Sequence, residues 1–223
     1  MCPALCENNA WLMVRDGIYY AVALVAAGAL VALVAGPLYA LPLCLVAVFC
    51  LYFFRDPERV VPAGPVAVSP ADGKIVAIRA DGADLARVSI FLSIFDVHVN
   101  RSPIAGAIAS VDYRKGRFLV ASREEASAQN EQNSVTVEGR GTRVVFRQIA
   151  GLIARRIVFD KKPGDTVAAG ERVGLIKFGS RVDVFLGPEW ELQIREGDRV
   201  KAGSSVLARL REAGRERRSS DGD

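Results

Sequence analysis

The feature that most constrains this chain is an uncharged stretch near its N-terminus, which runs from Gly17 to Phe54. As a helix with a rise of about 1.5 Å per residue, this stretch would extend about 57 Å, roughly two crossings of a ~30 Å hydrocarbon core. Gly36-Pro37 interrupts the stretch with a strong turn signal. We therefore predict two helices, at about 18–35 and about 38–54, joined as a membrane hairpin.

Positive residues lie at both outer ends of this hairpin. Arg15 precedes the first helix, and Arg55 and Arg59 follow the second. This distribution predicts that both ends lie in the cytoplasm, which places the protein in the cell membrane with the rest of the chain on the cytoplasmic side. A cleaved signal peptide fits poorly, because a second apolar run follows the first. A shallow re-entrant hairpin stays open, since the second leg is short and contains Pro42.

The composition of the sequence changes after Arg55, where short β-type runs alternate with segments that contain Gly and Pro. The clearest runs are "RVSIFLSIFDVHV", "SVTVEG", "TRVVFRQI" and "RIVFD". A polar stretch over 122–134 is predicted to form a loop or a short helix. The predicted segments are an N-terminal segment (1–16), the hairpin (17–54), a β-rich catalytic domain (55–210) and a disordered tail (211–223).

Composition narrows the possible sites and partners. The four cysteines all precede residue 51, so the β-rich part has neither a disulfide framework nor a CxxC metal site, which fits a reducing compartment. The net charge of +4 suits an anionic membrane surface or nucleic acid and does not decide between them. The middle of the chain has no Lys/Arg-rich block with interleaved aromatic residues. We therefore expect no nucleic-acid partner.

An internal repeat near the C-terminus predicts the architecture of the β-rich part. The pattern G-D-x-V-x-A-G-x-x-V occurs after Pro163 and again after Glu196. Each copy reads as a strand, a Gly-containing turn and a second strand, as in lipoyl- and biotinyl-type modules. The predicted fold is mainly β, a compact antiparallel domain with lipoyl-like half-repeats that follows the helical hairpin. Gly179-Ser180 lies between the two copies, and we expect it at a turn or an edge.

Three residues are candidates for chemistry. The hydroxyl of Ser180 can attack the carbonyl of Gly179 to form an ester, whose elimination would cut the chain and lead to a pyruvoyl group. This chemistry needs a base, and His98 is the one histidine in the chain. Asp72 lies in "PADG", which on local chemistry alone is a turn. Taken singly, each residue also has an ordinary structural explanation.

Together these signals resemble the phosphatidylserine decarboxylase proenzymes, in the short form of bacteria and archaea. The resemblance covers essentially the whole chain. Its most specific part is the run around Ser180. The segments that support it are "SPADGKI" at 69–75, "FLSIFDVHVNRSP" at 91–103, "QNEQNSV" at 129–135 and "GLIKFGSRVDVFL" at 174–186.

The resemblance implies that the proenzyme cuts itself between Gly179 and Ser180. Residues 1–179 would become the β subunit and residues 180–223 the α subunit, and the two would stay together as a heterodimer. Assembly into a homo-oligomer stays open. The former Ser180 would be a covalent pyruvoyl group, so the cofactor is pyruvate and no metal is needed. This group would serve as the electron sink while phosphatidylserine, a membrane lipid, loses CO₂ and becomes phosphatidylethanolamine.

The resemblance also implies roles for individual residues. Asp72 and Ser180 match the acid and the serine of an Asp-His-Ser processing set. His98 fits the first of two histidine positions of the longer relatives, and Arg101 stands where the second would be. Because arginine stays protonated, it is no base. Arg101 could bind the substrate carboxylate or phosphate, or it could form a surface salt bridge.

Two other classes of function remain open from the sequence. A membrane-anchored β-sandwich adaptor without chemistry would explain the hairpin and the repeat, and its chain would stay uncut. A serine hydrolase with Ser180 as its nucleophile would also stay uncut and would react with acyl-serine traps.

Overall fold

The structure is a computed structural model that describes residues 14–82, 85–117, 129–151, 157–176 and 180–211. The chain separates into two units. The first comprises Met1–Glu58 together with Phe95–Val97, and the second comprises Arg59–Ile94 together with His98–Asp223. Each unit is described below by itself.

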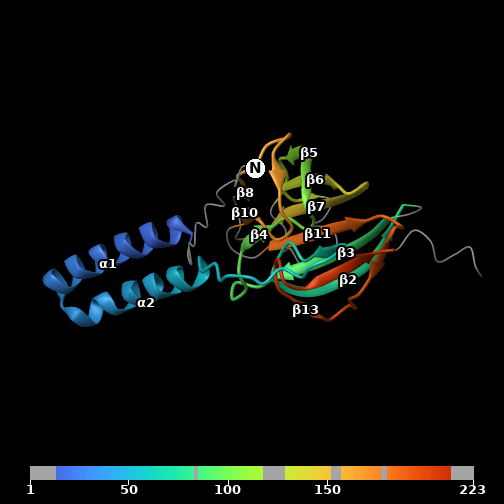
Figure 1. The fold of residues 1–223 in the computed structure, drawn as a ribbon. Coiled ribbons are helices and arrows are strands. Elements are labelled where there is room, and N and C mark those ends of the chain that lie inside the picture. Colours follow the sequence, from blue (N-terminus) through green and yellow to red (C-terminus); the bar gives the residue numbers. More distant parts are fainter. Residues whose placement is uncertain (1–13, 83–84, 118–128, 152–156, 177–179, 212–223) are drawn as a thin grey trace, which may run out of the picture. The chain divides into compact units, whose positions relative to one another are not determined.

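The first unit is a pair of apolar helices, α1 (Arg15–Ala35) and α2 (Pro37–Phe53) (Figure 1). Gly36 joins them with a φ of 103°, a left-handed angle that favours glycine. Pro37 begins α2, where its missing N–H costs no hydrogen bond. The predicted helix pair and its break at Gly36-Pro37 are therefore confirmed.

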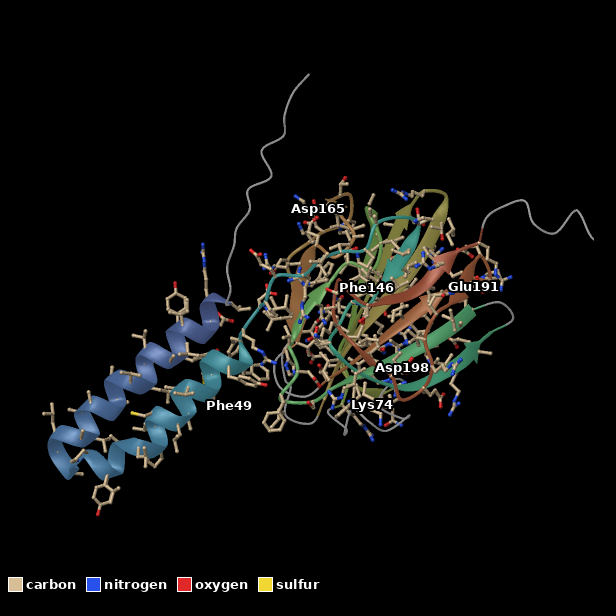
Figure 2. The ribbon with its side chains drawn as sticks, turned by 60° about the horizontal axis from the view of Figure 1, so that its bottom comes forward. Phe49, Lys74, Phe146, Asp165, Glu191 and Asp198 are labelled. Carbon is tan, nitrogen blue, oxygen red and sulfur yellow. The ribbon has the colours of Figure 1, made fainter. Side chains whose placement is uncertain are left out.

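The helices expose most of their apolar side chains. Leu33 is 86% exposed and Val34 is 81% exposed. Figure 2 draws the side chains of both helices and labels Phe49 of α2, which is partly buried. The buried positions of α1 are all Gly or Ala, and its Gly28 lies against Cys44 of α2, where the large Phe53 is buried as well. By length and composition, α1 can cross a membrane, whereas α2 has only 17 residues.

The second unit is built almost entirely from antiparallel strands. Eight of them form one sheet in the order β13-β2-β3-β11-β7-β6-β5-β9. Its strands are β2 (Gly73–Asp81), β3 (Leu85–Leu92), β5 (Gly106–Arg114), β6 (Gln132–Gly139), β7 (Thr142–Ala150), β9 (Thr166–Val167), β11 (Ser180–Leu186) and β13 (Arg199–Val200).

Two three-stranded sheets complete this unit, with the orders β4-β10-β8 and β1-β14-β12. Their strands are β1 (Val66–Val68), β4 (Val99–Arg101), β8 (Ile157–Phe159), β10 (Arg172–Ile176), β12 (Trp190–Leu192) and β14 (Val206–Leu210). The described part of the chain is thus mainly β and antiparallel, as predicted.

The sequence repeat has matching structures in its two copies. The first copy supplies β9 and β10 and the second supplies β13 and β14, so that each ends as the middle strand of a small sheet. Gly170 and Gly203 both have a φ of 73°. A Cβ atom on Gly170 would lie 3.4 Å from the Cα of Gly203, so the two turns pack against each other.

The hydrophobic core lies on one side of the eight-stranded sheet. Alternate residues of the strands point into it, as period-two side-chain alternation requires. On β11 these include Val182, Val184 and Leu186, and on β7 they include Phe146, which Figure 2 shows within the β unit. The intervening residues of β11 are buried as well, so this strand is covered on both sides.

The structure corrects two sequence predictions. Ser180 lies neither at a turn nor at an edge, because β11 pairs with β3 on one side and β7 on the other. The β-rich run "RVSIFLSIFDVHV" contains most of β3 and the first residue of β4. The polar stretch over 122–134 was predicted to be a loop or a short helix, but its last three residues belong to β6. The described residues do not include 122–128, Gly179 or the predicted tail from 212 onward.

Candidate functional site

Ser180 occupies the first position of a central strand. It is registered with Leu92 of β3 and with Ala150 of β7, and it is fully buried. The alternation of β11 places its side chain on the core side, the same side as Val182. Residue 180 is therefore held by neighbouring strands on both sides.

The hydroxyl of Ser180 has no hydrogen-bond partner among the residues that the structure describes. Leaving a buried hydroxyl unsatisfied costs about 1–3 kcal/mol. Such a group needs an explanation, and a reacting role is one of the few available. The described structure also shows that Ser180 Oγ is not hydrogen-bonded to His98 or Asp72.

Asp72 lies immediately before β2, and its carboxylate is firmly held. Nη2 of Arg59 lies 2.8 Å from Oδ2 and 3.1 Å from Oδ1 of Asp72. The backbone N–H of Ala202 donates to Oδ1 at 2.8 Å. Both side chains of the pair are largely buried. Asp72 is therefore more than a turn residue, since it fixes Arg59 and the second copy of the repeat to one loop.

His98 lies immediately before β4, and Arg101 is the last residue of β4. Both residues are buried. The carbonyl of His98 accepts a hydrogen bond from the N–H of Ile176 at 3.2 Å, which ties it to the end of β10. Nη1 of Arg101 donates to the carbonyl of Gly170 at 3.0 Å. Arg101 is buried rather than at the surface, and its Cδ would lie 3.0 Å from a Cβ atom on Gly203, so its side chain packs against the turn of the second repeat copy.

A chain of buried side-chain amides connects three of the motifs. Asn133 donates to Gln148 at 3.1 Å, Gln148 donates to Asn100 at 2.9 Å, and Asn100 donates to the carbonyl of Pro70 at 3.4 Å. Because the carbonyl of Pro70 can only accept, the amide of Asn100 has to donate to it, and this fixes the donor and the acceptor of each hydrogen bond in the series. The backbone N–H of Arg101 also donates to Pro70, at 2.9 Å.

This amide chain reaches the strand that begins at Ser180. Gln148 is registered with Val182, two residues after Ser180 on the same side of the sheet. The loop of Asp72, the strand after His98, and β6 and β7 are therefore linked through polar side chains inside the β unit. The network can hold these segments in one arrangement.

Several residues around Asp72 and in the amide chain were not predicted from the sequence. Arg59 was predicted only as a positive flank of the hairpin, and no role was predicted for Gln148 or Asn133. Asn133 lies within "QNEQNSV" and Arg59 follows the hairpin closely, so their positions offered a signal. Nothing in the local pattern around Gln148 sets it apart from other polar residues on β strands.

The opposite side of the sheet holds a second polar cluster. Arg181 Nε lies 2.7 Å from Asp183 Oδ1, and Arg181 Nη2 donates to Ser89 Oγ at 2.6 Å. Arg147 is registered with Asp183, and its Nε donates to Ser134 at 2.9 Å. Burial lowers the pKa of Arg147 below its usual value, although the nearby Asp183 acts in the opposite direction.

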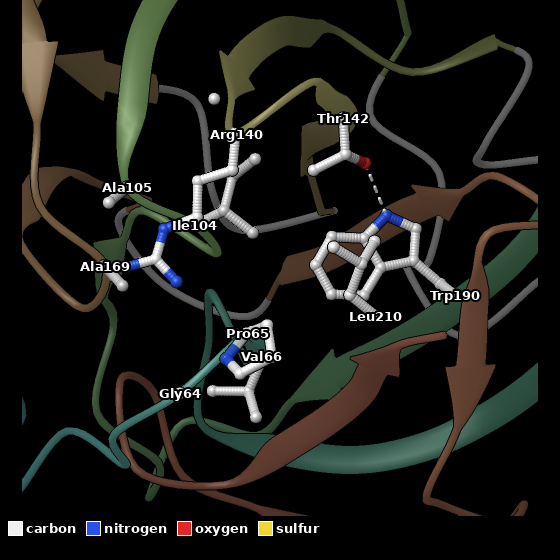
Figure 3. Close-up of a pocket in the computed structure, with 11 residues that line it drawn as sticks. Gly64, Pro65, Val66, Ile104, Ala105, Arg140, Thr142, Ala169, Trp190 and Leu210 are labelled. Carbon is white, nitrogen blue, oxygen red and sulfur yellow. Dashed lines mark hydrogen bonds between the residues drawn. The ribbon is translucent and has the colours of Figure 1, made fainter. Parts of the chain in front are cut away.

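A small cavity elsewhere in the β unit contains none of the predicted site residues (Figure 3). Its walls include Ile104, Arg140 and Trp190, and Trp190 Nε1 donates to Thr142 Oγ1 at 3.0 Å. The cavity measures about 70 Å³. Sites for small molecules usually measure about 300–1,000 Å³, so this cavity is too small to hold a lipid headgroup.

Comparison with known proteins connects this site to one family. The family described as phosphatidylserine decarboxylase has a model that matches residues 46–208, a span that includes Asp72, His98, Arg101 and Ser180. A relative from Solibacter usitatus is 70% identical over 197 residues, which cover 88% of this chain and 96% of the relative. Its name is phosphatidylserine decarboxylase proenzyme.

Two further relatives have the same name. The protein from Desulfotalea psychrophila is 45% identical over 174 residues, which cover 74% of this chain and 81% of the relative. The protein from Ruegeria pomeroyi is 49% identical over 174 residues, which cover 73% of this chain and 80% of the relative.

Proposed function

This chain belongs to the phosphatidylserine decarboxylase family, a family of carboxy-lyases, and on that basis we propose that it converts phosphatidylserine to phosphatidylethanolamine and CO₂ at a membrane surface. We further propose that it is made as a proenzyme that cuts itself between Gly179 and Ser180. The cut would leave residues 1–179 as one chain and residues 180–223 as the other.

The observation that supports self-cleavage most strongly is the state of Ser180. Its hydroxyl is fully buried and has no partner among the described residues, at the peptide where the resemblance places the cut. An unbonded hydroxyl is available to attack the carbonyl that precedes it. The register also accounts for the survival of a cut protein, because β11 lies between β3 and β7, two strands of the other fragment.

The residues around position 180 fit a pyruvoyl group derived from Ser180. Conversion of the Ser180 hydroxyl would break no hydrogen bond with the described part of the chain. Once formed, such a ketone supplies an electron sink for the pair of electrons that CO₂ leaves behind. The chain itself has to bind the substrate, orient it and move protons.

We assign those tasks to residues around the end of β10 and the loop before β2. His98 is the proposed proton acceptor for the Ser180 hydroxyl, and its main chain is anchored to Ile176, close in sequence to the cut. Asp72 is the proposed acid of the set, oriented by Arg59 and Ala202. Arg101 is the proposed partner of the substrate carboxylate or phosphate, with one nitrogen already bonded to Gly170.

The hairpin gives the proposed enzyme access to its substrate. A two-chain lipid leaves the bilayer only at a cost of about 0.8 kcal/mol per CH₂, so the enzyme has to meet the headgroup at the surface. Helix α1 is apolar and long enough to serve as an anchor. The arginines that flank the hairpin favour an anionic, cytoplasmic surface.

The substitution Ser180→Ala tests this proposal directly. We expect the variant to remain one chain of about 24.0 kDa and to release no CO₂ from phosphatidylserine, whereas the wild type gives two chains. Intact-mass measurement and a CO₂-release assay provide the readouts. Ser110→Ala is the control, because it removes a hydroxyl that bonds Thr136 at 3.0 Å, away from β11. A Ser180→Ala chain that still splits at the same peptide would disprove the assignment.

A further inference from the structure

The residue that follows Ser180 is a buried arginine that contacts both a carboxylate and a hydroxyl. Arg181 is 1% exposed, and its charge is paired with Asp183 on the same strand at 2.7 Å. Its Nη2 also donates to Ser89 on the neighbouring β3 at 2.6 Å. We call these three residues the β11 clamp.

Stability alone does not account for the clamp. Removing two charges from water carries a penalty that mutual attraction often fails to offset, and replacing a buried ion pair by uncharged residues is frequently neutral or stabilising. A better-attested use of buried polar groups is to specify register. In the clamp, the contact with Ser89 joins two strands at one defined position.

The side on which the clamp lies is also informative. Because side chains alternate along a strand, Arg181 and Asp183 point away from the core side that holds Ser180 and Val182. The clamp can therefore fix the strand without occupying the space around residue 180.

The proposed self-cleavage changes how position 180 is connected to the rest of the protein. Before the cut, β11 is covalently continuous with the residues that precede it; afterwards, residue 180 is a chain terminus, and chain termini fray unless they are tied down. We propose that the β11 clamp is a positioning device for the mature enzyme, which holds the new terminus in register so that the group at position 180 stays where the substrate meets it. This inference rests on the proposed function.

The experiment compares the clamp before and after the cut. The variant Arg181→Met/Asp183→Asn removes both charges together, so that neither is left buried alone. We expect it to cleave at the wild-type rate by intact mass, while kcat for phosphatidylserine in mixed micelles falls about tenfold with little change in KM, as for a slightly misplaced reacting group. A purely structural role would not separate cleavage from turnover in this way.

Hydrogen exchange provides a second readout on the same variant. The amides of 181–186 should exchange faster than in the wild type once the chain is cut. In a Ser180→Ala background, which we expect to stay uncut, the same substitutions should leave the protection of these amides unchanged. Faster exchange in both backgrounds would show that the clamp acts before cleavage, and would overturn the proposal.

A milder pair of variants guards against misfolding of the double variant. Ser89→Ala removes only the cross-strand contact of Arg181, and we expect kcat to fall about threefold, the effect of a modest hydrogen bond. Ser134→Ala is the matched control, because it removes the equivalent arginine–serine contact, that of Arg147, from the same side of the sheet. It should leave kcat unchanged.

The outcomes separate this inference from the proposed function. If the wild type never splits, the proposed function fails. If the wild type splits and decarboxylates but Ser89→Ala and the double variant both retain wild-type kcat, the clamp has no positioning role and only this inference fails. Equal losses in Ser89→Ala and Ser134→Ala would also overturn it, because the effect would then not depend on residue 181.

Discussion

The helical hairpin and the β unit distribute apolar and charged groups in opposite ways. The hairpin exposes large apolar side chains such as Leu33 and Val34 along its helices. The β unit instead buries some of its charged side chains, with Asp183 at 0% exposure next to Arg181. In a soluble protein, charged residues are almost never fully buried unless they are paired.

The contrast is the one expected if the two units face different surrounding media. Within α1 and α2 the backbone hydrogen bonds are satisfied internally, so their apolar surface suits a lipid environment. The β unit excludes water from its interior, and its charges remain because each has an opposite charge or polar partner in contact. The two units therefore differ in where their apolar side chains lie: on the surface in the hairpin and in the core in the β unit.

The largest effect should come from breaking a buried pair on one side only. Arg181→Met alone would remove the cation that lies 2.7 Å from the buried Asp183, and we expect a loss of about 3–5 kcal/mol in the free energy of unfolding. Urea unfolding of the β unit in the Ser180→Ala background is the measurement. The paired variant Arg181→Met/Asp183→Asn should lose much less, and equal losses in the two variants would contradict the role given to the pair.

A charge placed on the hairpin should have the next largest effect. Val25 in α1 and Tyr113 in β5 are both 54% exposed, so they form a matched pair of positions. Val25→Asp should weaken membrane insertion by about 3 kcal/mol, the cost of a carboxylate near the middle of a spanning helix. Tyr113→Asp should leave membrane association unchanged.

The readout is the fraction of each variant that stays with membranes after a carbonate wash. If Val25→Asp stays as firmly bound as the wild type, the exposed apolar surface of α1 does not face lipid, and the contrast between the two units loses its explanation.

The smallest effect should come from an exposed ion pair. Arg79 Nη1 lies 3.4 Å from Glu196 Oε1, with side chains that are 60% and 48% exposed. Since solvent screens such pairs, Arg79→Ala should lower the free energy of unfolding by less than about 0.5 kcal/mol in the same urea experiment. A loss comparable to that of Arg181→Met would mean that burial does not govern the value of ion pairs here.

The parts of the fold that were predictable depend on local signals. The uncharged run and Gly36-Pro37 predicted both helices within a few residues, because composition alone distinguishes an apolar helix. The repeat predicted matching turns, and Gly164 and Gly197 do have similar φ angles of 93° and 96°. The position of Ser180 in a central strand was not predictable, since strand order depends on pairing between distant segments.

The same division holds for the candidate site. Ser180, Asp72 and His98 stand in motifs that can be found by inspection, whereas the partner of Asp72 could not be read from a motif. Arg59 is 13 residues away from Asp72, and the contact depends on how two loops come together. Gln148 is 48 residues from Asn100, and only the packed β unit brings them within 2.9 Å.

The sequence by itself determined which segments avoid water, where the repeated turns lie and which few residues have the functional groups for the proposed chemistry. These properties follow from side-chain composition and from the φ angles that glycine and proline permit. Only the tertiary structure decided that the Ser180 hydroxyl is buried with no hydrogen-bond partner among the described residues and that Arg181 is neutralised beside it. Both depend on strand register, which the whole β unit sets through packing between residues far apart in the chain.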